Sequence, residues 1–365
     1  MDLSTGDTLI FVSVVLARFV APLLIPLFPL PAILTCLVLD AVDRDIFISL
    51  GGFDPESYQG IDKALDIFYL TIAMLSVLRN WTQQTAARVA RFLFYYRLVG
   101  VTAFELSEWR PLLLIFPNTF EYFFILYELL RGRRSPSLMT GRFYVVSAAL
   151  IWVFVKLPQE YWIHVAQLDF TDTVRQASPA VLGVLLGAAL VLAVGLRAAA
   201  HRFVPPPERG MVLAADPLPE NIDTARERAW LLNVRWRLLD VHLAEKILLV
   251  GLVTVIFGQV IPEVRASPLQ LTLGVAVVAT FSAALTLRAA RTGRNVESVF
   301  WEFALLSMAN VVFVVVASVL LRRSAGDIDV GTTLFFLLQL SLMVALYDRF
   351  KPVYDVRFMV QRTAA

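Results

Sequence analysis

Long apolar runs separated by short polar stretches make up most of this chain. A transmembrane helix needs about 20 predominantly apolar residues, and eleven runs approach that length. They cover residues 8–28, 31–50, 61–78, 89–106, 111–130, 143–156, 180–196, 243–261, 269–287, 296–320 and 331–346. The pattern predicts an all-α fold, a polytopic integral membrane helix bundle of about 11 transmembrane helices, with 10 and 12 as the alternatives.

Prolines and glycines interrupt these runs at defined places. The sequence PLFPLP after the first run cannot continue a regular helix and predicts a tight turn. Residues 51–60 are rich in turn formers and predict a loop. Pro117 lies inside the fifth run and predicts a kink beside Asn118. Gly183 and Gly187 stand four residues apart, a spacing that lets helices approach closely, and we interpret it as packing within this chain.

One substantial hydrophilic segment, residues 197–240, divides the chain. Its proline-rich front is typical of a linker. Thr224 and Glu227 fit a capping box before a basic amphipathic stretch, which predicts a helix on the membrane surface; a plain cytoplasmic extension of the next span is the alternative. We therefore expect four regions: residues 1–142 (spans one to five), 143–198 (spans six and seven), 199–242 (linker and surface helix) and 243–365 (spans eight to eleven and a short tail).

Basic residues in short loops predict the orientation, since they collect on the cytoplasmic side. They cluster at residues 131–134, 197–237, 288–294 and 349–357. This alternation predicts that the N-terminus lies outside and the C-terminus lies in the cytoplasm. The predicted location is the inner, or plasma, membrane. Arg322 and Arg323 break the pattern.

Composition agrees with the run pattern and excludes several kinds of chemistry. Hydrophobic residues make up 58% and charged residues 17% of the chain, against about 45–50% and about 25% in soluble domains. Cys36 is the only cysteine, which excludes a disulfide within the chain and a cysteine metal site. The three histidines are far apart, and no phosphate-binding glycine loop or nucleophile elbow is present. The basic segments suit lipid headgroups and give no support for nucleic-acid binding; the sequence predicts no particular cofactor.

Charged and polar residues nevertheless fall inside the apolar runs. Such groups are costly in a bilayer, at roughly 2.5–3.5 kcal/mol each, and normally face a protein interior or a water-filled cavity. Helical spacing places them on one face of each of several consecutive runs. We expect ion pairs that join Arg18 or Arg97 to an aspartate of the second run or to Glu121. The candidates for lining a polar cavity, open to the outside under the predicted orientation, are Arg18, Asp40, Asp43, Asp66, Arg97, Glu105, Asn118 and Glu121.

Two other interpretations of these charges stay open. The ion pairs could serve helix packing alone, and residues at the run ends, such as Asp62 and Glu105, could simply be solvated. Asp43 and Asp45 flank one residue and are weak candidates for a divalent metal. Multi-pass lipid-linked glycosyltransferases use acidic residues of an outer loop in that way, and this chain resembles them in plan only, because its outer loops are short.

Three functions follow as hypotheses. The first is a multi-pass membrane protein that transports or binds a small polar solute through the polar cavity. The second is an intramembrane enzyme of the transferase type that acts on a lipid-linked substrate from the outer face, with Asp40, Asp43 and Glu121 as acid, base or metal ligands. The third is a scaffold subunit that binds a partner protein in a membrane complex. All three place the chain in a lipid bilayer.

Overall fold

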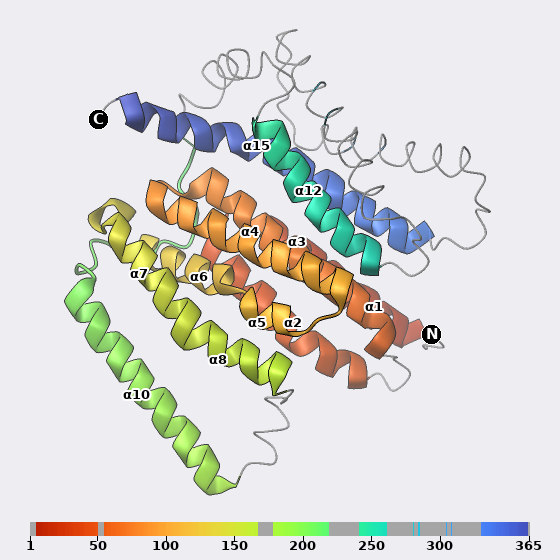
Figure 1. Ribbon diagram of the computed structural model, residues 1–365, viewed down its shortest axis with the longest axis horizontal. Helices are drawn as coiled ribbons and strands as arrows, with labels where there is room; N and C mark the ends of the chain where they lie inside the picture. The colour runs from red at the N-terminus through yellow and green to blue at the C-terminus, as the bar shows by residue number, and fades with distance from the viewer. Residues whose placement is uncertain are drawn as a thin grey trace. The chain divides into compact units, whose positions relative to one another are not determined.

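Helices form the whole regular structure of the part of the chain that is described. The computed structural model describes residues 5–49, 55–166, 178–218, 241–260 and 330–363, together with residues 280, 284, 304 and 308, and these contain no β-strand (Figure 1). The prediction of an all-helical fold is therefore confirmed for these residues. The chain divides into two compact units, one made of Met1–Trp81 and Ala214–Ala365 and the other of Thr82–Leu213.

The first unit is a bundle built around α3. Its described elements are α1 (Thr5–Val20), the 3₁₀ helix η1 (Ala21–Leu24), α2 (Pro29–Ser49), α3 (Pro55–Asn80), α12 (Val241–Val260) and α15 (Val330–Thr363). α3 packs against α1, α2, α12 and α15, and α12 lies alongside α15 (Figure 1). The buried side chains of α3, among them Phe68, Ile72 and Leu75, form the centre of this core.

The predicted turn after the first run is present and is tied to α3. α1 ends at Val20 and Pro22 opens a 3₁₀ turn, since proline fits the first turn of a helix but not its interior. Ser76 Oγ donates to the carbonyl of Ile25, and Asn80 Nδ2 donates to the carbonyl of Pro26. These bonds satisfy carbonyls that the turn leaves without helical partners, and they fix α1 and α2 against α3.

Two boundaries differ from the sequence prediction. α3 begins at Pro55, so the second part of the predicted loop at residues 51–60 is helical; proline is favoured at the first helical position because its missing N–H is not needed there. α15 continues from Val330 to Thr363 through Pro352, so the predicted tail is helical and largely buried. Residues 269–287, 296–320 and the predicted surface helix at residues 219–240 fall outside the described segments, apart from four single positions.

The second unit is a smaller helical assembly. Its described elements are α4 (Gln84–Ser107), α5 (Pro111–Ile115), α6 (Thr119–Arg131), η2 (Pro136–Leu138), α7 (Gly141–Ile151), η3 (Trp152–Lys156), α8 (Leu157–Glu160), η4 (Tyr161–Val165) and α10 (Pro179–Phe203). α4 packs against α5, α6 and α7.

The kink predicted at Pro117 is a complete break. α5 ends at Ile115, and α6 starts again at Thr119. Arg97 donates to the carbonyl of Phe116 at 2.9 Å, and the Tyr96 hydroxyl donates to the carbonyl of Ile115 at 3.0 Å. Side chains of α4 thus replace the helical hydrogen bonds that the break removes, as non-helical backbone in an apolar setting requires.

The sixth apolar run extends further than predicted. α7 passes through the π-helical η3 into α8 and the π-helical η4, so the chain stays helical as far as Val165. The wider π turns accommodate Pro158 without ending the helix. Lys156 and Glu160 are both buried inside the unit.

α10 carries apolar side chains that are exposed in the part of the chain that the structure describes. Val184, Leu190 and Val191 are about two-thirds or more exposed. A Cβ added at Gly183 or Gly187 would meet nothing within 4 Å, and α10 makes no extensive contact with another described helix. The predicted close packing of these glycines is therefore not found among the described residues.

Two helical segments of the described residues are long and apolar enough to cross a membrane. They are Pro111–Arg131 and Gly141–Ile163; Leu9–Leu24 is apolar but shorter. The predicted number of eleven spans and their orientation are not supported.

Candidate functional site

Three helices of the first unit bring five charged side chains together. Arg18 comes from the last turn of α1. Asp40 and Asp43 lie three residues apart on α2, and Asp62 and Asp66 lie four apart on α3, so each pair shares one helix face. We call these five residues the Arg18 cluster. The ring of Phe19 stacks on that of Phe68 at 5.1 Å and holds α1 against α3 next to the cluster.

One guanidinium group contacts all four carboxylates. Arg18 Nη2 lies 2.6 Å from Asp40 Oδ1 and 2.6 Å from Asp66 Oδ1. Arg18 Nη1 donates to Asp43 Oδ2 and to Asp62 Oδ1. The expected ion pair between Arg18 and the second run is thus present, and α3 contributes two further carboxylates.

The cluster has a buried base and an accessible rim. The side chains of Arg18 and Asp43 are both 3% exposed. Those of Asp40, Asp62 and Asp66 are 34%, 37% and 38% exposed. A ligand can therefore reach three carboxylates while the arginine stays beneath them.

The cluster holds more acidic than basic groups. With all four aspartates ionised, one arginine leaves three excess negative charges around the same guanidinium. Like charges this close cost free energy unless a cation or a proton balances them. The electrostatics of the cluster thus favour the binding of a cation or of a proton.

The rim carboxylates also satisfy the spacing of a metal site. One oxygen each from Asp40, Asp62 and Asp66 lies within 4.8 Å of the others, a separation that two metal–oxygen bonds of about 2.0–2.6 Å span. The weak metal candidates Asp43 and Asp45 are not part of this set: Asp43 pairs with Arg18 at the base, and the side chain of Asp45 lies outside the described ones.

The second unit contains its own buried polar group at the break between α5 and α6. Asn118 Nδ2 donates to Glu121 Oε2 at 3.0 Å, and the Asn118 N–H donates to Glu160 Oε1 at 3.1 Å. Lys156 Nζ donates to Gln159 Oε1 at 3.0 Å and lies 3.8 Å from Glu160 Oε1. Acidic groups at the N-terminus of α6 also interact favourably with its helix dipole.

The predicted cavity residues are therefore divided between the two units. Arg18, Asp40, Asp43 and Asp66 meet in the first unit, whereas Arg97, Asn118 and Glu121 surround the helix break of the second. Glu105 is half-buried in the last turn of α4. The spacing of four in the sequence places Asp62 on one helix face with Asp66, but Asp62 was interpreted as a solvated run end and was left out of the cavity candidates.

Comparisons add no family. The chain matches no family model, no curated protein and no solved structure. Any functional assignment therefore depends on the residues themselves.

A third group of charged side chains lies between α12 and α15 and was not predicted from the sequence. Lys246 Nζ lies 2.5 Å from Asp348 Oδ2, and both side chains are fully buried. Lys351 Nζ lies 3.2 Å from Glu245 Oε2 and 3.2 Å from Asp355 Oδ1. Asp348, Lys351 and Asp355 follow one another at intervals of three and four residues, a spacing that indicates one helix face. Their low hydropathy nevertheless led to the prediction that they belong to the tail after the last span.

Proposed function

We propose that this chain is a multi-pass membrane protein that binds or transports a polar solute, and that the solute, or an ion bound with it, is a cation held at the Arg18 cluster. The observation that carries the proposal is the imbalance of charge: one arginine stands against four aspartates, three of them accessible. A cluster that served only helix packing would be better balanced, because excess buried charge is costly.

Exposed apolar side chains of the second unit support a membrane location for the chain. Large apolar side chains are exposed along α10 and η3. Phe154 is 72%, Leu186 71% and Val191 73% exposed. Water-exposed apolar patches of this extent are uncommon on soluble proteins, and lipid would cover them. Two of the apolar helical segments are also long enough to cross the bilayer.

Binding can be tested by thermal unfolding of the purified protein in detergent. Chlorides of sodium, potassium, magnesium, calcium, manganese and small organic amines are compared at constant ionic strength. A ligand at 100 times its Kd stabilises the folded state by about 2.7 kcal/mol. We expect at least one cation to raise the unfolding temperature of the wild type and to have no such effect on the Asp62→Asn/Asp66→Asn variant.

The matched control is Glu208→Gln, which removes an exposed carboxylate from the second unit. It should keep the wild-type response. A cation that stabilises the wild type and the double aspartate variant equally would contradict the site, and a complete lack of cation effects would contradict the proposal. Uptake of the stabilising cation into proteoliposomes then separates a transporter from a protein that only binds.

The spacing of Asp40, Asp62 and Asp66 favours a second candidate, an intramembrane enzyme that acts on a lipid-linked substrate with a divalent metal at the rim. Arg18 already contacts one oxygen of each of these carboxylates, so a metal would bind the remaining oxygens or displace the guanidinium. This candidate predicts stabilisation by divalent ions alone and a lipid that copurifies with the protein. Stabilisation by monovalent ions or amines favours the first candidate.

A further inference from the structure

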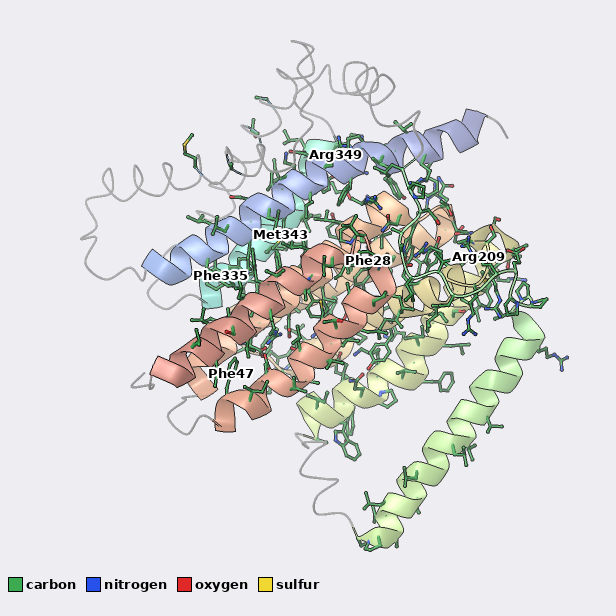
Figure 2. All side chains as sticks on the ribbon, turned by 180° about the vertical axis from the view of Figure 1, so that it is seen from behind. Phe28, Phe47, Arg209, Phe335, Met343 and Arg349 are labelled. Carbon is green, nitrogen blue, oxygen red and sulfur yellow. The ribbon has the colours of Figure 1, made fainter. Side chains whose placement is uncertain are left out.

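Ion pairs between α12 and α15 form a row along the two helices, which we call the ladder. α12 contributes His242, Glu245 and Lys246, and α15 contributes Asp348, Lys351 and Asp355 (helices in Figure 1). Both sets recur at intervals of three or four residues, so each lies along one face of its helix. Figure 2 shows the first unit from behind, turned by 180° from Figure 1, with Phe335, Met343 and Arg349 labelled along α15.

The charge of the ladder depends on one histidine. With His242 neutral, Glu245, Asp348 and Asp355 carry three negative charges and the two lysines carry two positive charges. One proton on His242 brings the sum of charges over these six side chains to zero. Histidine is the side chain that titrates in the physiological range, so this balance is sensitive to pH.

At the His242 end, the distance between the imidazole and the nearest carboxylate is longer than a hydrogen bond. His242 Nδ1 lies 3.6 Å from Asp355 Oδ2, just beyond hydrogen-bond distance. Asp355 Oδ2 is buried and accepts no hydrogen bond from the described residues. A side chain of α15 also bonds to the backbone of α12 here, because the Tyr347 hydroxyl donates to the carbonyl of His242 at 3.4 Å.

We propose that the pair His242 and Asp355 is a proton-binding site, and that protonation of His242 closes the gap with a charged hydrogen bond that holds α15 against α12. A protonated imidazole has two N–H donors, and Nδ1 would donate to Asp355 Oδ2. The proton comes from solvent and leaves to it, so no other reactant is needed.

The surroundings of the pair favour a positive charge on His242. Burial raises the pKa of Asp355, whereas Lys351 and His242 act to lower it, so a new positive charge beside this carboxylate relieves part of its cost. Glu245 adds a further negative charge nearby. Arg79 of α3 contributes a further charged group, with Arg349 near enough to affect it, and its carbonyl accepts from Arg357 of α15.

The test is the pH dependence of thermal unfolding of the full chain in detergent between pH 5.5 and pH 8. Stability gained by proton binding in the folded state is present at low pH and is lost as the pH rises. We expect the wild type to gain about 2 °C or more on going from pH 8 to pH 6 relative to His242→Gln, given about 2–4 °C per kcal/mol for domains of this kind. Asp355→Asn should lose the same gain.

Two variants sharpen the test. His242→Arg supplies a permanent positive charge and should show at pH 8 the stability that the wild type reaches at pH 6. His201→Gln removes a histidine of α10 in the other unit and should keep the wild-type pH dependence. A His242→Gln protein that retains the full pH dependence would overturn the proposal.

A measurement on the unmodified protein covers the case in which His242→Gln does not fold. Hydrogen–deuterium exchange of peptides from residues 348–360, corrected for the intrinsic effect of pH on exchange, should be slower at pH 6 than at pH 8. Equal protection at both values would also overturn the proposal. Neither experiment depends on the identity of a solute, so its failure leaves the cation site of the first unit untouched.

Discussion

Arg18 is the residue on which the charged cluster of the first unit depends. Its guanidinium contacts four carboxylates, and it is buried together with Asp43. Removing an aspartate lowers the repulsion within the cluster, whereas removing the arginine takes away the positive charge that all four carboxylates contact. The two kinds of substitution therefore differ in their expected effect, although both break ion pairs.

Arg18→Gln should destabilise the protein by about 3–5 kcal/mol, the typical cost of leaving buried charges uncompensated. Asp62→Asn should change stability by less than about 1 kcal/mol, because it removes one of three excess charges from a partly exposed position. Thermal or denaturant unfolding in detergent measures both. The double variant Arg18→Gln/Asp43→Asn should recover part of the loss, and equal destabilisation by Arg18→Gln and Asp62→Asn would contradict the charge argument.

At the scale of single elements, the break between α5 and α6 depends on a close approach of α4. A Cβ on Gly100 would lie 2.1 Å from Phe116 Cβ and 2.4 Å from its Cγ, so the residue before Pro117 occupies the space that glycine leaves. This approach also brings Arg97 to the carbonyl of Phe116. Glycine at this position is therefore part of the reason that the break can be capped.

Gly100→Ala should destabilise the protein by about 1–3 kcal/mol or more, since overpacking forces the backbone apart. Gly183→Ala is the matched control: its Cβ would meet nothing within 4 Å, and alanine should there be neutral or stabilising by about 0.5–1 kcal/mol through helix propensity. Unfolding temperatures of the two variants give the comparison. Adding Phe116→Gly to Gly100→Ala should relieve the clash, and a harmless Gly100→Ala would contradict the observed approach.

The pair Lys246 and Asp348 joins α12 to α15 without any exposed atom. Lys246→Met should cost about 3–5 kcal/mol, because it leaves Asp348 buried without its counter-charge. The double variant Lys246→Met/Asp348→Leu should regain most of that stability, since an apolar pair of similar volume avoids the desolvation of both charges. A double-mutant cycle of unfolding free energies measures the coupling. Additive losses would mean that the two side chains do not interact as described.

The sequence predicted those features that hydropathy and local chemistry determine. Most helices start and end near the predicted positions, the turn after α1 follows from its prolines, and the break beside Asn118 follows from Pro117. The pairing of Arg18 with the second run was expected because an arginine inside an apolar helix needs a nearby anion. These are short-range or strongly constrained properties.

The remaining features depend on contacts between residues far apart in the chain. Lys246 and Asp348 are 102 residues apart, so neither position shows its partner in a local window. Asp348 and Lys351 lower the hydropathy of α15 and made it look like a solvated tail, although their charges are compensated inside the unit. The sixth run was expected to end at Lys156, and the π turns through which the helix continues have no simple sequence signature.

At the scale of the whole molecule, the prediction that α5 and α6 together cross a membrane can be tested directly. The segment Pro111–Arg131 is long enough to cross a bilayer despite its break, and crossing would place residues before α5 and after α6 on opposite sides. Ser107 and Ser137 stand at these two ends, and both are exposed. The arginines just after α6 favour the cytoplasm for the Ser137 end.

Cys36 is the only cysteine, so Cys36→Ala provides a background in which single cysteines can be placed at Ser107 or Ser137. In intact cells, a membrane-impermeant maleimide should label the Ser107→Cys protein, because its thiol would face the outside. The Ser137→Cys protein should be labelled only after the cells are permeabilised, and both should react fully in detergent, which controls for folding and local access. Labelling of both variants in intact cells, or of neither, would mean that α5 and α6 do not cross the bilayer together. The reverse pattern would keep the span but invert its orientation, and the exposed rim of the Arg18 cluster would then have to be assigned to a side of the membrane by the same method, independently of the basic residues.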